Sequence, residues 1–158
     1  GSGKNDADSQ VTMVSGGVTT PESYLGSARA QNFSNGLILD GPHDFGRLKS
    51  PGPDQLAYGG KWLISPDIAT SAGGELGLNF GARRVYLVLG SPGGPKKVKV
   101  MLDGKPITAA DAGKDVKNGS AAIDGQRLYS LVDLPETGRH QLSLSLPSGV
   151  QGYAFTFG

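Results

Sequence analysis

Apolar and polar residues alternate in several short stretches of the chain. In residues 142–146 three leucines alternate with two serines, a pattern typical of a strand with one buried and one solvated face. After the turn residues at 147–149, the same alternation would place Tyr153, Phe155 and Phe157 on one face of a second strand. These two strands predict a hairpin that closes a sheet.

Other stretches carry the same signal. The alternation over 98–102 ends at Asp103 and Gly104, a pair that strongly favours a hairpin turn. Residues 85–89 are apolar at nearly every position, which indicates a central strand. We also expect a four-residue apolar strand over 36–39 and a long loop over 46–60.

The pattern as a whole predicts an all-β domain. The 158 residues include 26 glycines and 10 prolines, which leave little room for long helices. About eight or nine strands spaced by roughly ten residues are typical of a β-sandwich or jelly roll. We expect one such domain over residues 21–158. Residues 1–20 are predicted to be a flexible linker that opens with a Gly-Ser-Gly resembling a cloning scar.

Charge and composition exclude several partners. The chain has 15 basic and 14 acidic residues, a net charge of +1, so no long-range field favours nucleic acid. It has no run of about 18 apolar residues, so we expect no insertion into a membrane. It also has no cysteine, which rules out thiol chemistry within these residues.

The sequence predicts no enzymatic activity. It has no nucleophile elbow, no His-Glu-x-x-His, no Walker loop and no dinucleotide glycine fingerprint. The acidic residues are scattered over polar turns and form no evident catalytic pair. We therefore expect neither catalytic residues nor a cofactor.

A weak candidate for a metal site comes from the stretch at 40–44. Asp40, His43 and Asp44 combine carboxylates with an imidazole, ligands that divalent metals accept. The alternative, which we favour, is a polar turn built on the Asp-Gly-Pro sequence.

Aromatic residues are the best candidates for a binding site, because a flat ring offers an apolar platform to a sugar. Tyr58 and Trp62 flank a Gly-Gly pair in the predicted loop. We expect Tyr58 to be exposed, whereas a core position is the favoured interpretation of Trp62. Arg127 and Tyr129 share one face of a predicted strand and could present a donor beside a ring. The alternative, which we favour, is that Tyr129 fills the core with Arg127 at its rim.

Six segments together resemble a known family. They read TPESYLGSARAQNF, GGKWLIS, VYLVLGSP, KVMLDGKPI, RLYSLV and GVQGYAFTFG. With them the chain resembles the C-terminal domain of the DipZ-type thioredoxin-like proteins from Thr20 to Gly158. The opening TPESYLG and the closing YAFTFG are the most specific of these elements.

The resemblance implies a jelly-roll domain similar to carbohydrate-binding modules. In that family it follows a thioredoxin-like domain outside the cytoplasm, in bacterial proteins related to cytochrome c biogenesis. The Cys-x-x-Cys of the thioredoxin-like domain is absent from these residues, so the implied role is accessory. Our leading hypothesis is a non-catalytic module that binds glycan or cell-envelope polysaccharide. The alternative is a structural or interaction domain that packs on the thioredoxin-like domain and shapes its substrate access.

Overall fold

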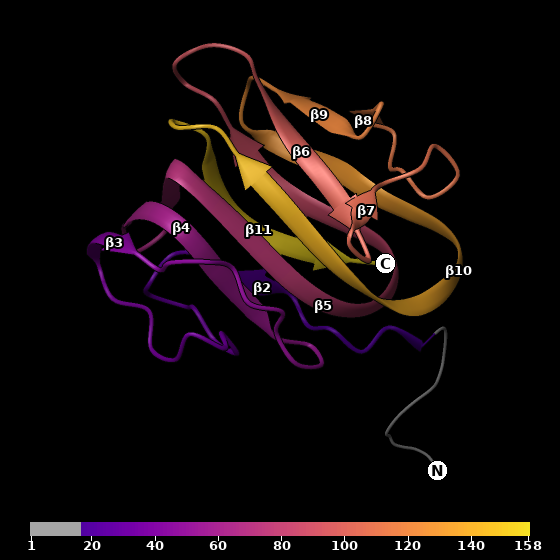
Figure 1. Ribbon diagram of the computed structural model, residues 1–158, viewed down its shortest axis with the longest axis horizontal. Coiled ribbons are helices and arrows are strands. Elements are labelled where there is room, and N and C mark those ends of the chain that lie inside the picture. Colours follow the sequence, from indigo (N-terminus) through magenta and orange to yellow (C-terminus); the bar gives the residue numbers. More distant parts are fainter. Residues whose placement is uncertain (1–16) are drawn as a thin grey trace.

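Strands account for almost all regular structure in the computed structural model, which describes residues 17–158 (Figure 1). These residues contain no α-helix, and hence none long and apolar enough to cross a membrane. The all-β prediction is thus confirmed. The strands are β2 (Ser23–Tyr24), β3 (Gly41–Asp44), β4 (Leu56–Ile64), β5 (Ala69–Gly90), β6 (Lys96–Leu102), β7 (Lys105–Pro106), β8 (Val116–Lys117), β9 (Ser120–Ile123), β10 (Arg127–Leu146) and β11 (Gln151–Phe157).

Two long strands organise the fold. β5 has 22 residues and β10 has 20, and they pair antiparallel over most of their length as they curve around the core (Figure 1). Their register shifts between Asp133 and Gly138, where Pro135 has no backbone N–H to give to a ladder. The pattern predicted several short strands here because such an interruption looks like a strand end in the sequence.

The sheet folds back on itself at the start of β11. Gln151 pairs with both Thr70 and Gly90, residues at opposite ends of β5. Strands therefore lie on both sides of one interior, and the predicted β-sandwich is confirmed. The strand order is β2-β11-β5-β10-β6-β9-β8, with β4 also beside β5 and β3 beside β4.

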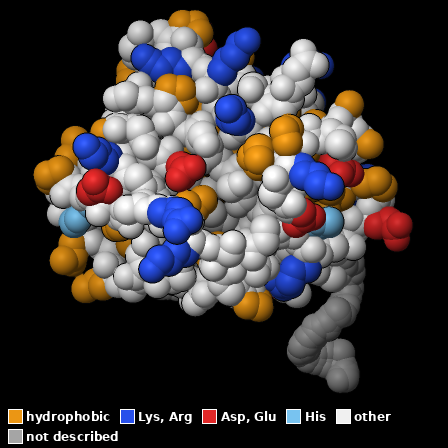
Figure 2. Space-filling view, in the orientation of Figure 1, with side chains coloured by type: hydrophobic (Ala, Val, Ile, Leu, Met, Phe, Trp, Pro, Cys, Tyr) orange, Lys and Arg blue, Asp and Glu red, His pale blue; other side chains and the backbone are white. Residues whose placement is uncertain are grey.

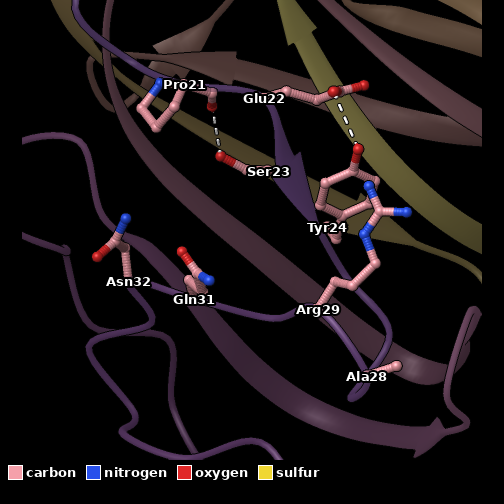
Figure 3. A pocket seen from close by; sticks show the side chains of 8 residues that line it. All are labelled: Pro21, Glu22, Ser23, Tyr24, Ala28, Arg29, Gln31 and Asn32. Carbon is pink, nitrogen blue, oxygen red and sulfur yellow. Dashed lines mark hydrogen bonds between the residues drawn. The ribbon is translucent and has the colours of Figure 1, made fainter.

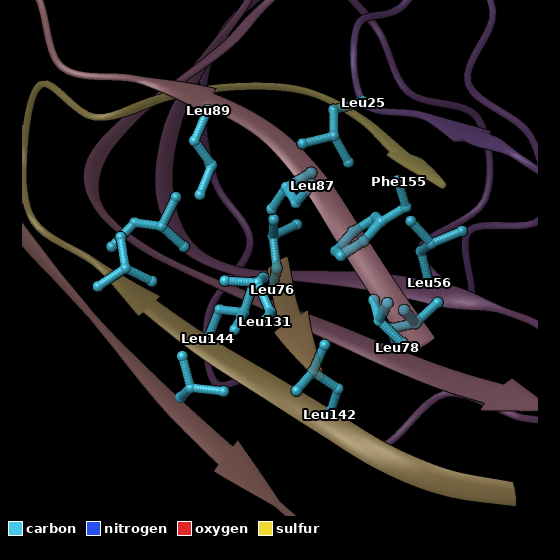
Figure 4. Close-up of a cluster of buried hydrophobic side chains, with 14 of the residues drawn as sticks. Leu25, Leu56, Leu76, Leu78, Leu87, Leu89, Leu131, Leu142, Leu144 and Phe155 are labelled. Carbon is cyan, nitrogen blue, oxygen red and sulfur yellow. The ribbon is translucent and has the colours of Figure 1, made fainter. Parts of the chain in front are cut away.

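The interior between these strands is a continuous apolar core (Figure 4). It is formed mainly by buried side chains of β4, β5, β6, β10 and β11. Leu142, Leu144 and Leu146 are among them, so the prediction of inward leucines at 142–146 is confirmed. Tyr153 is an exception to the expected face and is described below. The side chains labelled in the close-up are Leu25, Leu56, Leu76, Leu78, Leu87, Leu89, Leu131, Leu142, Leu144 and Phe155.

The hairpin predicted at Asp103 and Gly104 is present. The two residues have φ angles of 52° and 80°, and they join β6 to β7 through the Leu102–Lys105 pair. Positive φ at both central positions is what a type I′ turn requires. The Asp-Gly pair was sufficient to predict this hairpin, because the backbone angles of the turn depend on these two residues.

The predicted hairpin between β10 and β11 is wrong. β11 lies beside β5 and runs parallel to it rather than beside β10. The turn at 147–150 is held by Ser71 of β5, whose hydroxyl donates to the Leu146 carbonyl oxygen at 2.7 Å. The backbone of Ser71 also exchanges hydrogen bonds with Gly149 and Val150. A distant residue therefore directs the chain across to a different neighbour.

Two predictions in the first third of the chain are also wrong. Residues 36–39 form no strand, and strand β3 begins at Gly41 instead. The loop expected over 46–60 ends early, because β4 already starts at Leu56. Gly59 and Gly60 are inside β4, where Gly60 has a φ of 69° next to a register shift in the β4–β5 pair. Glycine occurs both in bulges and in loops, so the Gly-Gly pair was interpreted as part of a loop although it lies at a bulge in β4.

The chain enters the domain through Thr19 and Thr20, at the end of the predicted linker. The backbone N–H of Thr19 donates to the Gly81 carbonyl oxygen at 2.8 Å, and the Thr20 hydroxyl donates to Asp54 at 2.6 Å. These two residues are thus part of the folded domain. The remaining linker prediction falls mainly on residues 1–16, outside the described part of the chain.

Candidate ligand-binding site

Tyr58, expected to be exposed, is buried, with only 1% of its surface accessible. Its ring stacks on Phe33 and Phe45 at centroid distances of 4.8 and 5.0 Å. The expectation was wrong because Tyr58 belongs to strand β4, where its side chain points into the sandwich. It cannot serve as a surface platform for a sugar.

Trp62 is also a core residue, 1% exposed, which confirms the interpretation favoured from the sequence. Its indole N–H donates to the Gly59 carbonyl oxygen at 2.9 Å. The indole ring lies against Gly74 so closely that a Cβ added there would stand 2.2 Å from it. This side chain therefore supports the fold and has no surface available to a ligand.

Tyr129 fills the core while Arg127 lies at its rim, which confirms the interpretation favoured for this pair. Tyr129 is 1% exposed and donates its hydroxyl hydrogen to the Gly125 carbonyl oxygen at 2.6 Å. The Arg127 guanidinium lies 3.8 Å from the ring centroid and pairs with Asp115 at 2.9 Å. Its hydrogen bonds hold the pKa of the Asp115 carboxyl below the ordinary value. Tyr129 therefore holds the turn before β10, and Arg127 connects the start of β10 to the segment before β8.

Asp40, His43 and Asp44 do not assemble into a metal site. A ring nitrogen of His43 bonds the Leu39 carbonyl oxygen at 2.8 Å, Asp40 accepts a hydrogen bond from Ser27, and Asp44 accepts one from the following turn. Residues 17–158 hold no group of three or more His, Asp or Glu side chains suited to a metal. The favoured turn is not present either, because Gly41–Asp44 is a strand.

A bulge in β11 brings one aromatic side chain to the surface. Gly152 pairs with Leu89 and Phe155 pairs with Leu87, so three steps along β11 match two along β5. Gly152 and Phe155 both face the core, and the extra residue lets Tyr153 turn outward. The expectation that Tyr153 shares the inner face with Phe155 is therefore wrong.

Tyr24 lies beside this bulge and lines a cleft of about 240 Å³ (Figure 3). Its hydroxyl donates to Glu22 at 3.0 Å, and the Arg29 guanidinium lies 3.6 Å from its ring centroid. Gln31 and Asn32 line the opposite side, as Figure 3 shows. We call this hollow the Tyr24 cleft.

A second hollow of about 200 Å³ adjoins the Tyr24 cleft and shares Tyr24 and Arg29 with it. We call it the Tyr153 cleft, because Tyr153 lines it as well. Ala154 pairs with Tyr24 across the β2–β11 ladder and contributes to the lining, together with Asp67. The half-buried rings of Tyr24 and Tyr153 thus lie near the small side chain of Ala154. The Arg29 guanidinium and the Asp67 carboxylate line the same hollow.

This arrangement suits a polyhydroxylated ligand. Aromatic rings offer apolar contact to C–H faces, while Arg29 donates and Asp67 accepts hydrogen bonds. Sequence reasoning missed Tyr24, Arg29 and Tyr153. The one available signal was Gly152, since a glycine inside a strand pattern suggests a bulge. No local signal pairs Tyr24 with Arg29 or brings either to β11.

Comparison with known proteins gave one family match. A family model described as thioredoxin like C-terminal domain matches residues 20–158. No curated protein matches the chain.

The solved structures that are similar to the chain include two family two carbohydrate esterases, each with a TM-score of 0.47. One is a family two carbohydrate esterase from Clostridium thermocellum in complex with cellohexaose, at 20% identity over 75% of this chain and 31% of that chain. The other is a family two carbohydrate esterase from Cellvibrio japonicus, at 15% identity over 88% of this chain and 34% of that chain. The chain thus spans about a third of the length of these two proteins. Their esterase activity is therefore stated of them alone.

Proposed function

The chain belongs to the family of thioredoxin-like C-terminal domains, and on that basis we propose that it is a non-catalytic accessory module that binds glycan. In the full protein it would follow a thioredoxin-like domain outside the cytoplasm and attach that domain to cell-envelope polysaccharide. The absence of cysteine from these residues assigns any thiol chemistry to another domain.

One observation carries this proposal: Tyr24 and Tyr153 both face outward beside the polar side chains of Arg29 and Asp67. Rings with neighbouring donors and acceptors can replace the water around sugar hydroxyls while they cover apolar C–H groups. Both histidines are engaged elsewhere, His43 with Leu39 and His140 with Asp103. The clefts therefore present contact groups without an imidazole base.

The test is a glycan-array screen of the 158-residue protein, followed by calorimetric titration of the polysaccharides that bind. We expect Tyr153→Ala to weaken binding at least tenfold, about 1.4 kcal/mol, with little change in the melting temperature. Tyr86→Ala is the matched control, because Tyr86 is also half-buried but lines neither cleft. A folded wild type that binds no glycan on the array would refute the proposal.

A second candidate function, docking on a protein domain, is favoured by a different surface. Leu37, Leu39 and Leu63 are exposed by 84%, 57% and 48%. Hydrophobic side chains gather along the left edge of the molecule in Figure 2, where β3 lies in Figure 1. Apolar groups on a surface are typical of contact regions when they cluster. In this case a Leu39→Asp, Leu63→Asp double variant would lose association with the thioredoxin-like domain, whereas Tyr153→Ala would retain it.

A further inference from the structure

A third hollow of about 250 Å³ continues the candidate site beyond Tyr153. Tyr153 lines both the Tyr153 cleft and this hollow. The hollow is also lined by Gln126 and Asp124, from the turn before β10, and by Gln151 of β11. We call it the Gln126 cleft. Tyr24 and Arg29 line both of the first two hollows, and Tyr153 lines both of the last two, so the three clefts are neighbours in this order along the surface.

Each cleft is small for an independent site. Volumes of about 240, 200 and 250 Å³ are below the roughly 300–1,000 Å³ typical of a small-molecule pocket. A ligand held by one hollow alone would bury little surface and would bind weakly. A chain of linked units that occupies all three would add contacts while it loses its rotational and translational freedom only once.

The side chains along the three clefts favour an uncharged chain. Glu22, Asp67 and Asp124 contribute carboxylates, whereas Arg29 contributes the guanidinium. An acidic polymer would meet more like than opposite charges there. Gln31 in the first cleft and Gln126 in the third are exposed amides, each able to donate and accept hydrogen bonds as a hydroxyl does.

We propose that the three clefts form one extended groove for a neutral oligosaccharide, with about three consecutive sugar units spread over the hollows. This inference rests on the proposed glycan-binding function. It adds that the ligand is recognised along its chain rather than at a single terminal sugar.

The test uses ladders of neutral oligosaccharides from the monosaccharide to roughly six units, derived from cellulose, chitin, mannan, galactan and arabinan. We expect affinity for at least one ladder to rise tenfold or more between one and three units and then to level off. Equal affinity for the monosaccharide and the longer members would overturn the groove but leave the proposed function standing. Binding to no ladder, together with an empty glycan array, would refute both.

Variants at the far end of the groove test the length dependence directly. Gln126→Ala should lower affinity for a bound tetrasaccharide about threefold or more while affinity for the disaccharide stays unchanged. Gln141→Ala is the matched control, since Gln141 bonds Pro51 and lines none of the three clefts. An equal loss for both ligand lengths would contradict the groove. Stronger binding of polygalacturonate than of every neutral ladder would refute the charge preference.

Discussion

The hydroxyl of Tyr58 donates a hydrogen bond to the carbonyl oxygen of Leu25 at 2.7 Å, within the core. The bond ties β4 to the segment that follows β2, 33 residues away in the sequence. Burial raises the pKa of the Tyr58 phenol, so this group remains a neutral donor. A ring that the sequence suggested for ligand contact instead holds the backbone of Leu25, the residue after Tyr24.

Tyr58→Phe should lower the free energy of unfolding by about 1–3 kcal/mol, because it leaves the buried Leu25 carbonyl oxygen without its partner. Urea unfolding followed by circular dichroism measures the change. Tyr86→Phe, at a half-buried ring, should stay within about 0.5 kcal/mol of the wild type. If Tyr58→Phe were as stable as the wild type, the hydrogen bond from Tyr58 to Leu25 would not contribute to the free energy of unfolding.

Trp62→Ala and Tyr24→Ala should separate the scaffold from the site. Trp62 is fully buried, so its truncation should cost about 3–5 kcal/mol of stability. Tyr24 is half-buried in a cleft, so Tyr24→Ala should weaken glycan binding with a much smaller loss of stability. Thermal melts and titrations of both variants give the comparison, and a Tyr24→Ala protein that binds as the wild type does would remove Tyr24 from the site.

Ser71→Ala should destabilise the crossover into β11. The Ser71 hydroxyl donates to the Leu146 carbonyl oxygen and accepts from the Gly74 N–H at 2.8 Å, both in buried surroundings. Loss of the hydroxyl leaves these groups unpaired, which predicts a cost of about 1–3 kcal/mol. Denaturant unfolding tests this, with Ser143→Ala on the half-buried face of β10 as the control. If the two substitutions had equal effects, the hydrogen bonds of the Ser71 hydroxyl would not stabilise the crossover into β11.

The stability of the protein should fall in acid partly because of Asp115. Its pKa lies below the ordinary 3.8, chiefly through the hydrogen bond from Arg127, against an opposing effect of desolvation. A depressed folded-state pKa stabilises the protein above pH 3.8, and this contribution disappears as the pH falls through the lower folded value.

Asp115→Asn should therefore be less stable than the wild type at neutral pH and should lose less stability on acidification below about pH 4. Arg127 is half exposed, so the difference should be modest. Urea unfolding at a series of pH values measures it. The same pH slope in both proteins would show that this carboxylate does not contribute to the acid response.

The class of fold and the local turns could be predicted from the sequence. Two-residue alternation predicted the inward leucines of β10, and the residues at 85–89 predicted a strand in the middle of the sheet. The Asp103–Gly104 turn was also predictable, because its backbone angles depend on those two residues alone. For Trp62 and Tyr129, the interpretation as core residues was correct.

The pairing of the strands and the choice of aromatic residues that reach the surface could not be predicted, because both depend on contacts between distant segments. Alternation states which side chains share a face, but not which strand lies beside them, and one extra residue in a bulge reverses the faces beyond it. Tyr58 is buried because it belongs to β4 and points into the sandwich, whereas the bulge in β11 turns Tyr153 outward to lie beside Tyr24. The candidate site depends on β2, β5 and β11, which are far apart in sequence, and contacts over such separations leave no periodic signal.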